Sequence, residues 1–194
     1  MKDLNVKPKK SISAYIMHIM IGIASVLSIL SFYMYYIVGS KSEGLLWVGI
    51  ISVLIVYQFS LRLIFGTVNS HLPISYRQRL FKELGFEKSI YKRVYVKKWK
   101  HKVPTYNPEL FVLEDFTMEE IASTMAKVEA DHWANVLISF SSLLFIFIWG
   151  RAWFFVPVVI FAVLFDLVFI SIQRFNRPRV LKIIEKEESR RNYE

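Results

Sequence analysis

Four long runs of this chain contain no charged side chain apart from Asp166. No Asp, Glu, Lys or Arg occurs between Lys10 and Lys41, Glu43 and Arg62, or His132 and Arg151, and Asp166 alone interrupts residues 152–173. About 20 apolar residues suffice for a helix to cross a bilayer. The whole chain is also 54% hydrophobic. The runs therefore predict an all-α membrane protein with about four transmembrane helices, near residues 11–38, 44–66, 133–150 and 152–173.

Basic residues gather at one end of these runs. Ten Lys or Arg side chains lie between Arg77 and Lys102, where only Glu83 and Glu87 are acidic, and the tail after Gln173 is also basic. Basic flanks of short loops remain in the cytoplasm during insertion. We therefore expect one integral domain over residues 1–194, multi-pass in the cell membrane. Both termini, a loop near 67–132 and a tail at 174–194 would be cytoplasmic, with the N-terminal end marked by Lys2, Lys7, Lys9 and Lys10.

The predicted loop changes character along its length. Its basic first half carries interleaved aromatic residues, which suits an interfacial segment on anionic membrane lipids better than a nucleic-acid surface. The apolar spacing of residues 92–99 favours neither helix nor strand. A solvated charge run and a dock for the phosphates of an acyl donor such as coenzyme A both remain open. The second half is acidic and includes Glu109, Glu114 and Asp115.

The residue types restrict the available chemistry. With no cysteine, the chain has no disulfide, thiolate nucleophile or cysteine metal ligand. Glu129 and His132 have a spacing of three, but a di-iron site needs a second such pair, which the chain lacks. We expect no bound metal and no bound cofactor.

Two helix signals bring His132 close to Asp166. Thr117 and Glu120 have capping-box spacing, which predicts a helix running from the cytosol into the third span. A tight turn at Gly150–Arg151 would place His132 level with Phe169, and Asp166 within one turn of it. A carboxylate beside an imidazole fixes its tautomer and raises its basicity, as a general base requires. Alternatively, Asp166 pairs with Arg62 or Arg174 to hold helices together.

Three motifs resemble those of a known family. Residues 97–104 (KKWKHKVP), Glu129-x-x-His132-Trp133 and residues 173–179 (QRFNRPR) resemble, in order and context, motifs of glycosyl-4,4′-diaponeurosporenoate acyltransferases, small bacterial membrane proteins. The resemblance covers roughly residues 80–181 and implies transfer of a fatty acyl group to a sugar hydroxyl of a glycosylated carotenoid on the cytoplasmic side. Asp166, Val168 and Met125–Ala126 depart from the family pattern, which leaves another lipid or glycolipid open as acceptor.

These observations give a set of expected site residues. His132 would act as the general base, with Glu129 or Asp166 orienting it, so that a hydroxyl attacks a thioester of coenzyme A or acyl carrier protein directly. Donor phosphates or the developing oxyanion would be bound by residues near the motifs, although a headgroup anchor is the alternative. This set comprises Lys98, Trp99, Trp133, Gln173, Arg174, Asn176, Arg177 and Arg179. The competing function is a non-catalytic adaptor or assembly protein that binds a partner or anionic lipids through its basic loop and tail.

Overall fold

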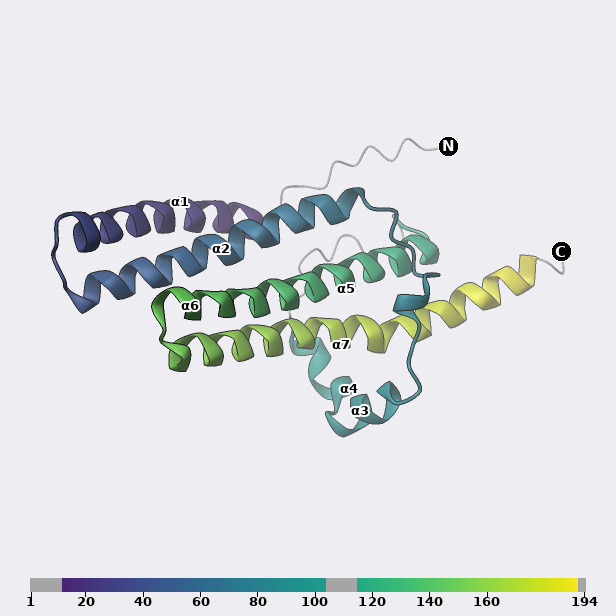
Figure 1. Cartoon of the computed structure of the whole chain (residues 1–194). Helices are drawn as coiled ribbons and strands as arrows, with labels where there is room; N and C mark the ends of the chain where they lie inside the picture. Colours follow the sequence, from purple (N-terminus) through teal and green to yellow (C-terminus); the bar gives the residue numbers. More distant parts are fainter. Residues whose placement is uncertain (1–11, 104–114, 192–194) are drawn as a thin grey trace. The chain divides into compact units, whose positions relative to one another are not determined.

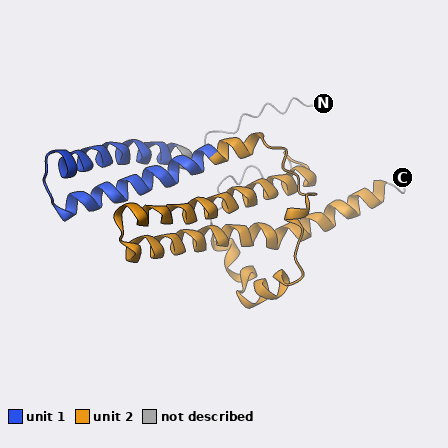
Figure 2. Cartoon of the chain, in the orientation of Figure 1, with its two compact units in different colours: residues 1–64 blue, residues 65–194 orange. Residues whose placement is uncertain are grey.

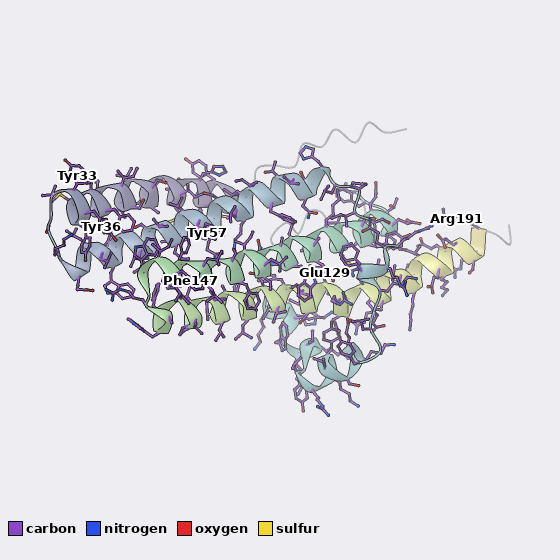
Figure 3. All side chains as sticks on the ribbon, viewed as in Figure 1. Tyr33, Tyr36, Tyr57, Glu129, Phe147 and Arg191 are labelled. Atoms are coloured by element: carbon purple, nitrogen blue, oxygen red, sulfur yellow. The ribbon has the colours of Figure 1, made fainter. Side chains whose placement is uncertain are left out.

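The computed structural model describes residues 12–103 and 115–191, and all regular structure in these ranges is helical (Figure 1). Four helices are long and apolar enough to cross a membrane, which confirms the predicted all-α membrane fold. Large apolar side chains point outward from them, including Phe147, which is 87% exposed and labelled in Figure 3. Such a surface suits contact with lipid rather than water. The N-terminal lysines, Pro104, Glu109 and Glu114 lie outside the described residues.

The chain divides into two compact units, residues 1–64 and 65–194 (Figure 2). In the first unit, α1 (Ile12–Phe32) continues into a π-helical turn at Tyr33–Ile37, and α2 (Glu43–His71) begins soon afterwards. The Phe32 ring lies so close to Gly49 that a Cβ atom there would stand 2.6 Å from a ring carbon. Glycine at position 49 therefore permits the contact between α1 and α2.

The second unit contains the basic segment and the helical hairpin. After α2 ends, a 3₁₀ turn at Arg79–Phe81 leads to α3 (Glu87–Arg93) and α4 (Val96–Trp99). Tyr95, in the left-handed region with φ 53°, breaks the helix between α3 and α4. That break explains why the apolar spacing of residues 92–99 follows no single period.

Helix α5 (Met118–Ser141) runs antiparallel to α7 (Ala152–Arg191), and the two pack along much of their length (Figure 1). A 3₁₀ turn at Ser142–Phe145 and the short α6 (Ile146–Trp149) precede the connection. The expected tight turn is present, with Gly150 at φ 71° and Arg151 at φ 50°. Ala122 and Ala126 on α5 are fully buried, and side chains this small permit close packing around the helix.

The N-terminus of α5 has the predicted capping box. The Thr117 hydroxyl accepts from the Glu120 amide at 3.3 Å, and the Glu120 carboxylate accepts from the Thr117 amide at 2.8 Å. Thr117→Ala should destabilise this end by about 1 kcal/mol. Hydrogen exchange in detergent would show faster exchange confined to residues 118–121. Thr124→Ala, inside the same helix, serves as the control, and equal exchange in both variants would contradict the assignment.

The last helix extends well beyond the span expected at residues 152–173. Helix α7 continues through Pro178 to Arg191, a total of 40 residues. Proline usually ends a helix because it lacks an N–H and crowds the preceding turn. Here the side chain before it, Arg177, is buried and hydrogen-bonded to two other segments, which fixes this turn. At 1.5 Å per residue α7 is about 60 Å long, twice a hydrocarbon core of about 30 Å.

Candidate active site

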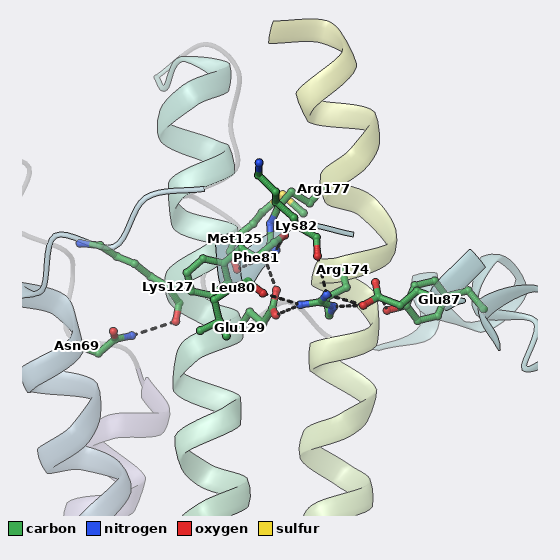
Figure 4. A network of polar contacts seen from close by, with 11 residues as sticks. Asn69, Leu80, Phe81, Lys82, Glu87, Met125, Lys127, Glu129, Arg174 and Arg177 are labelled. Atoms are coloured by element: carbon green, nitrogen blue, oxygen red, sulfur yellow. Dashed lines mark hydrogen bonds and ion pairs between the residues drawn. The ribbon is translucent and has the colours of Figure 1, made fainter. Parts of the chain in front are cut away.

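Glu129 on α5 is the centre of a buried ion-pair cluster. Its carboxylate has no exposed surface and accepts from Arg174 Nη1 at 2.6 Å and from Arg177 Nη2 at 2.5 Å (Figure 4). Both arginines come from α7, one helical turn apart. The two oxygens of one carboxylate thus hold two guanidinium groups.

Arg174 extends this cluster to α3. Its Nε donates to Glu87 Oε1 at 2.9 Å, and its Nη2 donates to the Lys82 carbonyl at 2.9 Å (Figure 4). The Tyr91 hydroxyl donates to Glu87 Oε2 at 3.3 Å. Burial, and next the charge of Glu87, raise the pKa of Tyr91 to about 12. Tyr91 therefore remains a neutral hydrogen-bond donor at physiological pH.

Arg177 ties the same cluster to the segment before α3. It is 2% exposed, and its Nη1 donates to the Phe81 carbonyl at 2.8 Å, while Nη2 also reaches the Met125 carbonyl at 3.3 Å. The formal charges of the four ionic members balance: Glu87, Glu129, Arg174 and Arg177. We call these four residues the Glu–Arg cluster. Since charges buried in low dielectric must be paired, the cluster holds the 79–93 segment against α5 and α7.

His132 and Asp166 form a second polar contact between the same two helices. His132 Nδ1 lies 2.8 Å from Asp166 Oδ1, as the depth register predicts. Asp166 is fully buried and also accepts from Asn135 Nδ2 at 3.3 Å. The imidazole stacks on Phe169 with ring centroids 4.7 Å apart and planes inclined by 6°. Stacking and the hydrogen bond together fix the orientation of the ring.

The second ring nitrogen of His132 remains available. Among the described residues, His132 Nε2 has no hydrogen-bond partner, and the side chain is 19% exposed. When Asp166 is ionised it can only accept a hydrogen bond, and in that state Nδ1 carries the proton and Nε2 carries a lone pair. This arrangement of carboxylate, imidazole and free nitrogen can remove a proton from a hydroxyl group.

The structure separates the expected site residues into different surroundings. His132 contacts Asp166, whereas Glu129 contacts Arg174 and Arg177. The remaining members lie elsewhere: Trp133 is 43% exposed, Gln173 is half-buried, Trp99 Nε1 donates to the Val94 carbonyl at 2.8 Å, and Asn176 accepts from Lys100 at 2.6 Å. Within residues 12–103 and 115–191, no three His, Asp or Glu side chains are grouped to hold a metal ion.

A cavity of about 500 Å³ lies beside the C-terminal half of α7, among residues of α3 and α4. Lys98 and Arg179, both expected to bind the donor, line it. Their cations lie over aromatic rings, Lys98 4.7 Å from the centre of Tyr95 and Arg179 4.6 Å from that of Phe175. We call this cavity the lysine pocket. It is lined by Glu83, Lys88, Tyr91, Lys92, Tyr95, Lys97, Lys98, Phe175, Pro178, Arg179 and Lys182.

Sequence reasoning did not identify Glu87, Tyr91 or Asn135 as site neighbours. Glu87 is one of two acidic residues among ten cations in residues 77–102. A lone carboxylate in such a basic segment indicates a paired, buried group, and Glu87 is 5% exposed. No comparable signal marked Asn135, a single amide within an apolar run.

Comparison with known proteins agrees with the motifs. The sequence profile of the family described as glycosyl-4,4'-diaponeurosporenoate acyltransferase matches residues 77–186, more than half of the chain. No curated protein and no solved structure matches it. The matched range contains His132, Asp166 and the whole Glu–Arg cluster. The predicted resemblance is confirmed, and the chain belongs to the glycosyl-4,4'-diaponeurosporenoate acyltransferase family.

Proposed function

We propose that this protein transfers a fatty acyl group from a thioester to a hydroxyl of a glycosylated carotenoid or a related glycolipid. The observation that carries this proposal is the contact of His132 Nδ1 with Asp166, with Nε2 left free. An imidazole held in one tautomer by a buried carboxylate is a common form of general base for hydroxyl groups.

The reaction requires no covalent intermediate on the protein. His132 Nε2 removes the proton from the acceptor hydroxyl while its oxygen attacks the thioester carbonyl carbon. When the tetrahedral intermediate collapses, the carbon–sulfur bond breaks and the imidazolium gives its proton to the departing thiolate. An ester and a free thiol result, and His132 returns to its neutral form. Asp166 stabilises the imidazolium charge throughout.

The surroundings of His132 suit an acceptor that arrives from the membrane. Next to it on α5, Trp133 is 43% exposed, and Leu137, one turn further into the apolar run, is 69% exposed. Lipid chains can lie against such a surface, while a sugar head group reaches the polar end of the span. The basic residues at this end favour a cytoplasmic position, where thioesters of coenzyme A or acyl carrier protein are made.

Lipid mass spectrometry tests this function directly. Cells that contain a glycosylated carotenoid should express the protein, a His132→Gln variant, or a His101→Gln variant at equal abundance. His101 is an exposed histidine on the basic segment and gives a matched control. We expect an acyl ester of the glycolipid with the wild type and with His101→Gln, and its loss with His132→Gln. Identical lipid profiles for all three proteins would favour the non-catalytic adaptor.

A further inference from the structure

The lysine pocket concentrates positive charge without matching carboxylates. Six of its lining residues are cationic and one, Glu83, is acidic. Glu83 lies 3.5 Å from Lys88, whereas Lys92, Lys97 and Lys182 have no hydrogen bond or ion pair among the described residues. The cations that line one pocket repel one another, and water and salt only partly screen this repulsion. An anion in the pocket would relieve this repulsion.

The titration of a neighbouring lysine reflects the same positive field. Lys100 lies beside the pocket, where its ammonium donates to Asn176 at 2.6 Å. Burial lowers the pKa of Lys100, and the charges of Arg179 and Lys97 lower it further. Arg179 and Lys97, which line the pocket, thus lower the pKa of Lys100 outside it.

The walls of the pocket are aromatic as well as basic. Tyr91 and Phe175 meet edge to face with centroids 5.9 Å apart, and Arg179 lies over the Phe175 ring. Tyr95 adds a third ring beside Lys98. Flat apolar faces next to flexible ammonium groups can accept a ligand that has both an anionic group and an apolar or planar part.

We propose that the lysine pocket binds a ligand through its phosphate groups. Phosphate oxygens accept several charge-assisted hydrogen bonds, and lysine ammonium groups are common phosphate binders. The number of unpaired cations suits a ligand with more than one negative charge. Two sources supply this chemistry at a membrane surface: the phosphoadenosine diphosphate part of coenzyme A and the headgroup of an anionic phospholipid.

The lysine pocket is distinct from the His132 site. Phe175 follows Asp166 by nine residues, which places it on the opposite side of α7 and about 14 Å further along the axis. Phosphate binding therefore does not require His132 to be catalytic. In coenzyme A the thioester is separated from the phosphates by a long flexible arm, so the two groups need not occupy adjacent sites.

Binding to purified protein in neutral detergent tests the pocket, with two probes in separate arms. One arm titrates coenzyme A, with dephospho-coenzyme A as comparison, by calorimetry. The other follows phosphatidylglycerol and phosphatidylcholine by native mass spectrometry. The pocket variant is Lys92→Gln/Lys97→Gln, and the control Lys186→Gln/Arg190→Gln removes two charges from an exposed part of α7 outside the pocket.

We expect at least one phosphate probe to bind the wild type, and its dissociation constant to rise about tenfold or more in the pocket variant but less than twofold in the control. Tight binding of coenzyme A assigns the soluble source, and preference for phosphatidylglycerol over phosphatidylcholine assigns the lipid source. Absence of binding by both probes, or an equal loss in both variants, overturns the proposal. A His132→Gln protein that still binds but makes no ester would show that pocket and catalysis are separate.

Discussion

His132→Gln should lower the rate of acyl transfer by about 10²–10⁴-fold, the usual contribution of a positioned general base. Glutamine can still hydrogen-bond to Asp166, but its amide cannot take a proton from a hydroxyl near neutral pH. Loss of the base should lower kcat and leave the thermal stability nearly unchanged, because His132 lies at the edge of the helix contact with 19% exposure.

Asp166→Asn tests the same pair from the other side. An asparagine amide can donate to His132 Nδ1, which would move the imidazole proton to Nε2 and remove the lone pair that acts as base. In triads of this type such a change lowers kcat by about 10⁴-fold although the geometry is kept. We therefore expect a loss at least as large as that for His132→Gln. The losses of rate in Asp166→Asn and His132→Gln should not add in the double variant, since each change disables the same base.

Asp131→Asn is the matched control for this experiment. Asp131 precedes His132 but accepts from Asn69 at 2.6 Å, and an asparagine oxygen can accept the same bond. Acyl-transfer rates of the purified protein in detergent, with a fatty acyl thioester and a glycosylated acceptor, should remain within threefold of the wild type, about 0.6 kcal/mol or less. Equal activity of Asp166→Asn and Asp131→Asn would exclude Asp166 as the orienting group.

The His132–Asp166 contact could be predicted because it depends on few variables. A tight turn at Gly150–Arg151 sets the relative depth of two regular helices, and regular geometry then aligns His132 with Phe169. The four membrane helices could be predicted for a similar reason. Uncharged runs of this length have few alternatives to membrane helices.

The partners of Glu129 could not be predicted in this way. Both partners, Arg174 and Arg177, also contact residues 79–93, a segment made of a 3₁₀ turn and the short helix α3 without one regular period. A basic cluster after an apolar run suggests exposed phosphate binders, but the continuation of α7 through Pro178 buries Arg177 against Glu129 instead. Basic side chains are therefore not equivalent: those of the Glu–Arg cluster bind protein groups, whereas Lys92, Lys97 and Lys182 of the lysine pocket have no ion pair among the described residues.

Glu129→Ala should destabilise the protein by about 3–5 kcal/mol, because it leaves the buried guanidinium of Arg177 without its carboxylate and removes one of two from Arg174. The matched control is Glu119→Ala on the same helix. Glu119 is about one-third exposed and lies 3.5 Å from Arg191, so its loss should cost about 1 kcal/mol or less. Equilibrium unfolding in mixed detergent, followed by circular dichroism, compares the two variants.

Arg177→Lys gives an intermediate case that separates charge from geometry. A lysine ammonium can still pair with Glu129, but it cannot also replace both guanidinium donors to the Phe81 and Met125 carbonyls. Leaving a buried carbonyl without a donor costs about 1–3 kcal/mol, less than the loss expected for Glu129→Ala.

Equal stability of Glu129→Ala and Glu119→Ala would contradict a structural role of Glu129. If Glu129→Ala then also lost acyl transfer while fully folded, Glu129 would act in catalysis rather than through the Glu–Arg cluster.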